Sequence, residues 1–177
     1  MKKFLIHVFL ILTGFILYFL QADFFSWFTI AGVMPNLFVI FILFIGLFGS
    51  KVMGTTYGIA IGMIIDFLFR DKIGITAATL GIVGFLATVF DKNFSKDSRM
   101  TIMVMVAGST VLYEGIQYFL NYIVYSTTVE ILYFLKILAI EVIYNIILTI
   151  ILYPLMQKCG YAMENELKGN KILTRYF

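Results

Sequence analysis

Apolar residues fill most of the chain, in six runs separated by short polar or glycine-containing breaks. A helix that crosses a bilayer needs about 20 mainly apolar residues. The pattern therefore predicts an all-α membrane protein whose six transmembrane helices form one bundle. We expect these helices at residues 4–20, 35–49, 52–69, 73–90, 100–124 and 131–156.

The first run begins after two lysines, as a signal peptide does, but QADFFSW follows it in place of a small-residue cleavage site. We therefore expect a retained helix.

The second run is interrupted by Pro35, and proline suits the first turn of a helix but not its interior. We expect an interfacial or re-entrant segment up to Met34, and then a short helix that begins at Pro35.

The composition agrees with this interpretation. Hydrophobic residues make up 62% of the chain and charged residues 13%, with a mean hydropathy of +0.99. Soluble domains carry about 25% charged residues, so a soluble protein is excluded. We expect one transmembrane domain, residues 1–158, and a short cytoplasmic tail, residues 159–177. Three basic residues of the tail either attract anionic lipid or are simply solvated: Lys168, Lys171 and Arg175.

The basic residues also predict the orientation, because cytoplasmic loops carry an excess of lysine and arginine. If the N-terminus is cytoplasmic, the outer side receives Arg70, Lys72 and Lys136. The inner side receives Lys2, Lys3, Lys51, Lys92, Lys96, Arg99, Lys158, Lys168, Lys171 and Arg175. Both termini are therefore predicted to lie in the cytoplasm.

Residues 54–70, GTTYGIAIGMIIDFLFR, carry small side chains on one helix face. Gly54, Gly58 and Gly62 recur every fourth residue, and the next step reaches Asp66. Small residues at this spacing let two helix backbones approach closely inside a membrane. The glycine face either packs within the chain or receives a helix of a partner, and the pattern alone leaves both open.

Acidic residues within the predicted helices are the main candidates for function. An ionised carboxylate at the bilayer centre costs about 2.5–3.5 kcal/mol, so it normally faces a partner or a cavity. Asp66 either pairs with Arg70, one turn further on, or makes a buried contact. Glu114 begins a polar stripe with Gln117, Tyr118 and Asn121, and Glu141 begins another with Asn145 and Thr149.

With the predicted topology, these acids all lie between the middle of the bilayer and its outer side. We therefore expect an outer polar cluster or an outward-opening pocket formed by Asp66, Arg70, Glu114, Gln117 and Glu141. The tyrosines of the fifth helix either line a ligand pocket there or simply pack: Tyr113, Tyr118 and Tyr122.

Residues for catalysis or metal binding are scarce. Cys159 is the one cysteine and His7 the one histidine, and His7 lies at the opposite, cytoplasmic end. The chain has no phosphate-binding glycine loop and no metal-ligand spacing. We predict no catalytic site, metal or cofactor, no nucleic-acid partner, and a protein that is not an enzyme.

Two segments resemble the rod shape-determining protein MreD family. They are MPNLFVIFILFIGLFGSKVMGTTYGIAIGMIIDFLFRDKIGITAATLGIVGFL (34–86) and AIEVIYNIILTIILYPLMQ (139–157). The first has a Pro-Asn-Leu opening, a short basic turn, a glycine-spaced helix that ends in Asp and an Ile-Gly start to the next helix. The second has an Asn in mid-helix and a Tyr-Pro pair near its end. The positions that match the family are Pro35, Asn36, Gly62, Asp66, Gly74 and Asn145.

The resemblance implies a non-enzymatic scaffold that supports lateral peptidoglycan synthesis in the bacterial cytoplasmic membrane. It implies that the chain works with a bitopic MreC-like protein, near MreB, a SEDS polymerase and a class B penicillin-binding protein. It also implies a fold similar to the S components of energy-coupling-factor transporters. A vitamin-like small-molecule binding component of a transporter is therefore the alternative function. An ion channel is disfavoured, because no predicted helix is polar along its full length.

Overall fold

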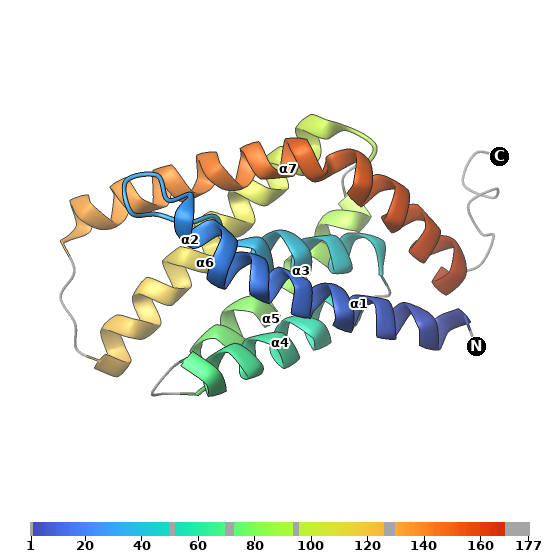
Figure 1. The fold of residues 1–177 in the computed structure, drawn as a ribbon, viewed down its shortest axis with the longest axis horizontal. Coiled ribbons are helices and arrows are strands. Elements are labelled where there is room, and N and C mark those ends of the chain that lie inside the picture. Colours follow the sequence, from blue (N-terminus) through green and yellow to red (C-terminus); the bar gives the residue numbers. More distant parts are fainter. Residues whose placement is uncertain (1, 50–51, 70–72, 94–95, 126–129, 169–177) are drawn as a thin grey trace.

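The computed structural model describes residues 2–49, 52–69, 73–93, 96–125 and 130–168. Within these residues the fold is all-α (Figure 1). The longer helices are α1 (Lys2–Phe19), α3 (Leu37–Phe48), α4 (Met53–Phe69), α5 (Ile75–Asn93), α6 (Arg99–Tyr125) and α7 (Ile131–Lys168). A π-helical turn, η1 (Leu20–Phe24), and the short α2 (Phe25–Trp27) extend α1.

The prediction of an all-α chain with six helices is confirmed. Three helical segments are long and apolar enough to cross a membrane: Lys3–Trp27, Arg99–Val124 and Ile131–Leu167. The other three apolar helices are shorter: Leu37–Phe48, Met53–Phe69 and Ile75–Asp91. Because successive helices alternate in direction, the start of α1 and the end of α7 lie at the same end of the molecule (Figure 1).

The short helix α3 forms the centre of the bundle. Its sequence is apolar all round, which is typical of a helix with no solvent-facing side, and every one of its 12 residues is buried. It packs against α1, α4, α5, α6 and α7. At 1.5 Å per residue, α3 is only about 18 Å long, less than the hydrocarbon thickness of a bilayer. The helices around α3 therefore have to cover the rest of the bilayer thickness.

The segment before α3 explains why this helix is short. The chain reverses in a tight turn in which Ile30 and Val33 exchange two backbone hydrogen bonds of 3.0 Å. The prediction that the helix begins at Pro35 is wrong by two residues. Asn36 has a non-helical backbone and its side-chain oxygen accepts a hydrogen bond from the N–H of Val39, so Asn36 is the N-cap and the helix begins at Leu37.

Helices α4 and α5 form the closest pair in the bundle. The glycine face of α4 lies directly against the backbone of α5, and all three glycines are buried. A Cβ atom on Gly54 would lie 2.6 Å from the carbonyl oxygen of Gly84. On Gly58 it would clash with the carbonyl oxygen of Leu80, and on Gly62 with the backbone of Ala77. The glycines thus allow contact between the two backbones, and α5 fills the face that a partner helix would need.

The long helix α7 runs along the whole bundle and bends toward its end (Figure 1). Its 38 residues amount to about 57 Å, more than a bilayer core requires. Pro154 lies inside it, and beyond this residue Tyr161 packs edge-on against Phe48 of α3, with ring centroids 5.2 Å apart. The predicted boundary between residues 158 and 159 falls within this helix.

A lysine holds this end of α7 in place. The Lys96 ammonium lies 2.8 Å from a carboxylate oxygen of Asp91 and 2.8 Å from one of Glu164. It also donates a hydrogen bond of 3.1 Å to the carbonyl oxygen of Leu47. Lys96 therefore joins the ends of α3 and α5 to the last turns of α7.

The packing of α4 on α5 can be tested with a single methyl group. Gly58→Ala would place a Cβ atom against Leu80 of α5, so we expect it to lower the free energy of unfolding by about 1–3 kcal/mol. The matched control is Gly115→Ala in α6, where a Cβ atom meets no other atom within 4 Å. Thermal unfolding of the purified proteins in detergent measures both. Equal melting temperatures for the two variants would contradict the close contact.

Candidate functional site

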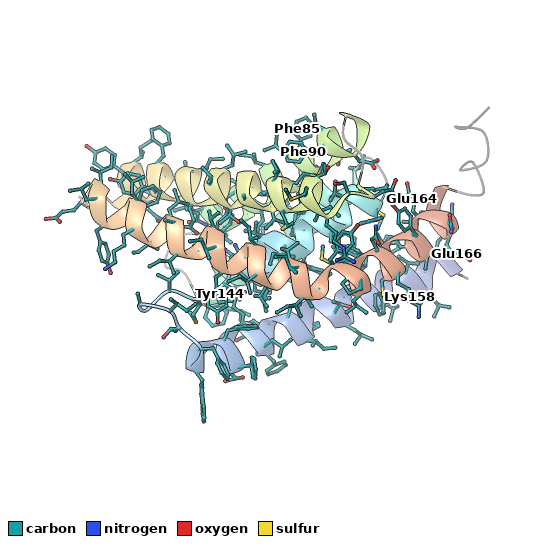
Figure 2. The ribbon with its side chains drawn as sticks, turned by 90° about the horizontal axis from the view of Figure 1, so that it is seen from above. Phe85, Phe90, Tyr144, Lys158, Glu164 and Glu166 are labelled. Carbon is teal, nitrogen blue, oxygen red and sulfur yellow. The ribbon has the colours of Figure 1, made fainter. Side chains whose placement is uncertain are left out.

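Polar side chains from four helices, from η1 and from the segment before α3 meet inside one end of the bundle. The four helices contribute the ends of α4 and α6 and the beginnings of α5 and α7. Figure 2 shows α6 and α7 side by side, with Tyr144 of α7 directed toward the segment that follows α1. The hydroxyl of Tyr144 donates a 2.6 Å hydrogen bond to the carbonyl oxygen of Phe28 in that segment.

Asp66 caps the beginning of α5. Its carboxylate is fully buried and accepts three backbone hydrogen bonds, from Gly74 (2.8 Å), Thr76 (3.1 Å) and Ala77 (3.1 Å). The N–H groups at the start of a helix have no partner within the helix and carry partial positive charge, so a carboxylate there is stabilising. Gly74 has φ +114, a conformation that side-chain-bearing residues rarely adopt. Arg70, the other expected partner of Asp66, lies outside the described residues.

Asn145 joins three helices at the same level. Its side-chain oxygen accepts a 2.8 Å hydrogen bond from the backbone N–H of Asn36, and its amide nitrogen donates one of 3.0 Å to the hydroxyl of Thr110. It is fully buried. The next backbone N–H, that of Leu37, donates to the side-chain oxygen of Gln21 at 2.9 Å. Side chains of α7 and η1 thus satisfy the first N–H groups of α3.

The two glutamates predicted on neighbouring helices meet. The carboxyl group of Glu141 interacts with the side chains of Glu114, Asn36 and Asn145. Glu141 is 5% exposed, and its Oε1 atom has no hydrogen-bond partner among the described residues. The structure therefore holds two carboxyl groups next to each other in a largely buried position.

Gln117 links α6 to α5. Its amide nitrogen lies 3.2 Å from the hydroxyls of Thr79 and Tyr113 and 3.4 Å from that of Thr76. Asn121 donates to its side-chain oxygen at 3.3 Å. Because the backbone N–H of Thr76 also reaches Asp66, the cap of α5 and the polar stripe of α6 belong to one connected set of contacts.

A cavity of about 650 Å³ opens between these helices. Its polar walls come from Gln21, Asn36, Thr76, Glu114, Gln117 and Asn121. Aromatic and aliphatic walls come from Tyr18, Met34, Phe38, Ile65, Phe69, Tyr113, Tyr118, Phe134 and Ile137. Tyr122 is not part of these walls and is 53% exposed. Asp66 lies outside the cavity wall, so the predicted cluster divides into a structural cap and a cavity region.

Sequence reasoning missed the threonines and Gln21 that complete these contacts. Thr76, Thr79 and Thr110 have near-neutral hydropathy and do not stand out in an apolar helix. A signal was nevertheless present, because Thr76 and Thr79 are spaced three apart at the start of a helix, opposite the polar stripe of α6. Among the residues that the structure describes, no group of three His, Cys, Asp or Glu side chains could hold a metal ion.

The role of Asp66 as a cap can be tested by an isosteric change. Asp66→Asn replaces one acceptor oxygen by an NH₂ group that faces backbone N–H donors, so we expect the free energy of unfolding to fall by about 1–3 kcal/mol. Asp23→Asn in the exposed turn η1 is the matched control. Thermal unfolding and hydrogen exchange of the first turn of α5 measure the effect. Unchanged protection of the Thr76 and Ala77 amides would contradict the cap.

The family profile of rod shape-determining protein MreD matches residues 2–160. No curated protein and no solved structure matched the chain. The expected similarity to the S components of energy-coupling-factor transporters therefore stays a prediction. The matched range covers all six long helices up to the last two turns of α7, and the chain accordingly belongs to the MreD family, non-enzymatic membrane proteins that take part in determining the rod shape of bacteria.

Proposed function

We propose that this protein is a scaffold of the bacterial elongation machinery, which supports lateral peptidoglycan synthesis together with a bitopic MreC-like protein. MreB, a SEDS polymerase and a class B penicillin-binding protein are the further partners that this role implies. The observation that carries the proposal is the family match over residues 2–160.

The buried polar groups support a role in assembly rather than in chemistry. Asp66, Asn145 and Gln117 each hold two or more parts of the chain together through hydrogen bonds. A carboxylate has about four acceptor positions, and three of those of Asp66 are occupied by backbone N–H groups of α5 and of Gly74 before it. These residues thus stabilise the packing of the bundle. Partners would then bind to its outer surface.

The lipid-facing surface is where we place the partners. The glycine face of α4 is covered by α5, so a partner helix would have to displace α5 to reach it. By contrast, α1 exposes a series of large apolar side chains, including Phe4, Phe9, Phe15 and Phe19. Such a surface faces lipid or a neighbouring transmembrane helix.

We also propose that six segments cross the membrane and that both termini are cytoplasmic. The start of α1 and the end of α7 share one end of the bundle, and Lys3, Lys96, Arg99 and Lys158 lie toward this end. Among described side chains, Lys136 is the basic residue toward the other end. The positive-inside rule then assigns the end that holds the termini to the cytoplasm.

Labelling of introduced cysteines tests this topology. In a Cys159→Ser background, we expect a membrane-impermeant maleimide to label Glu130→Cys, at the start of α7, in intact spheroplasts. We expect Glu166→Cys, in the last turn of α7, to be labelled only after the membrane is opened. A permeant maleimide controls for the reactivity of both positions, and the reverse pattern would contradict the proposed orientation.

The scaffold role is tested by gentle extraction of the tagged, full-length protein from its own membrane. Native mass spectrometry is expected to show a complex with a bitopic MreC-like chain, and depletion of the protein is expected to turn rod-shaped cells round. A tagged multi-pass protein of unrelated function, extracted in the same way, controls for non-specific association. Unchanged cell shape together with an associated ATPase and membrane coupler would favour the transporter component instead.

A further inference from the structure

The cavity has the size and the position of a ligand site. Its volume of about 650 Å³ lies within the range of about 300–1,000 Å³ that is usual for small-molecule sites. The wall residues lie toward the ends of α1, α4 and α6 and the beginnings of α3, α5 and α7. All six of these helix ends lie at one end of the bundle, so the cavity lies within that end and is bounded by six helices rather than by two.

Acidic groups give the cavity a charge preference. Glu114 lies in its wall, and Glu141 contacts both Glu114 and a second wall residue, Asn36. The Oε1 atom of Glu141 is a buried acceptor without a hydrogen-bond partner among the described residues. Glu141 is not itself part of the wall, so it affects the cavity through its contacts with Glu114 and Asn36. No lysine or arginine is present among the described residues of the wall.

Aromatic rings line the cavity beside Glu114, because Tyr118 follows Glu114 by one turn on α6. Tyr118 and Phe134 contact each other across the wall with ring centroids 4.5 Å apart, and Tyr113 contributes a third ring. Aromatic faces attract cations, and proteins bind quaternary ammonium groups against such rings. The same rings would accept the apolar part of a ligand. A same-sized anion, by contrast, would meet the repulsion of Glu114.

From this arrangement we propose that the cavity binds a molecule that carries an ammonium group, with Glu114 in direct contact with the cation and Glu141 close behind it. Two sources share this chemistry: a free organic amine and the ethanolamine headgroup of a membrane lipid. The proposal does not depend on the scaffold function, since an MreD-type scaffold is complete without a ligand.

Binding is tested on the full-length protein in a neutral maltoside detergent with three probes of one shape. The probes are phenethylamine, phenethyl alcohol and phenylacetate, and the shift in melting temperature gives their affinities. Native mass spectrometry compares the retention of phosphatidylethanolamine and phosphatidylglycerol that have identical acyl chains. We expect the ammonium compound of at least one series to bind about tenfold more tightly or more, as a charge-assisted contact implies.

Two variants assign this preference to the cavity. Glu114→Gln keeps the shape of the side chain and removes its charge, and Ile137→Trp narrows the cavity while both glutamates are retained. Both are expected to abolish the preference, and both are checked for a single symmetric peak in size-exclusion chromatography. Glu130→Gln, an exposed acid near the same end of the bundle, is expected to retain it.

Each outcome decides the proposal. A preference for phenethylamine that Glu114→Gln removes identifies a free amine as the ligand type. A preference for phosphatidylethanolamine that the same variant removes identifies a lipid headgroup. The proposal is overturned if neither series discriminates by charge, if phenylacetate binds best, or if the preference survives in Glu114→Gln or Ile137→Trp.

Discussion

Backbone N–H groups at the start of a helix need hydrogen-bond partners, and within a membrane there is no water to supply them. The buried architecture of this protein depends on how that requirement is met. Asp66, in the last turn of α4, satisfies three N–H groups at the start of α5. Asn145 and Gln21 do the same for the start of α3. Polar side chains that would be costly to bury alone thus connect one helix to another.

The Asp66 cap and the glycine contacts act on the same pair of helices. Gly54, Gly58 and Gly62 bring α4 against α5 along its length, while Asp66 fixes how far one helix is displaced along the other. The close pair then encloses one side of α3, and α6 and α7 close the other side. A central helix of 12 residues can be held in this way, although it is too short to cross a bilayer unaided.

Sequence reasoning was most successful where hydropathy changes sharply. It predicted the six helices, and it placed Glu114 and Glu141 at one depth, where the structure brings them together. It could not say which helix covers the glycine face, because a stripe of small residues indicates close approach but not the neighbour. It also placed the start of α3 at Pro35, since the capping geometry of Asn36 is not visible in hydropathy.

The last turns of α7 were missed for a different reason. The segment MENELK is polar, which indicates a tail, although Met, Glu, Leu and Lys are all good helix formers. Hydropathy detects the part of a helix that lies in hydrocarbon and does not detect its continuation beyond the membrane surface. Contacts with Phe48 and Lys96, which lie far away in sequence, hold this continuation in place.

The continuity of α7 has a mechanical consequence. One end of this helix carries Phe134, Ile137 and Glu141 at the cavity, and the other carries Glu164 at the ammonium of Lys96. One continuous helix therefore joins the two ends of the molecule. Pro154 has no backbone N–H to donate to the preceding turn, so the helix bends more easily here than where this hydrogen bond is present. We therefore expect any change in the direction of one part of α7 relative to the other to occur at this residue.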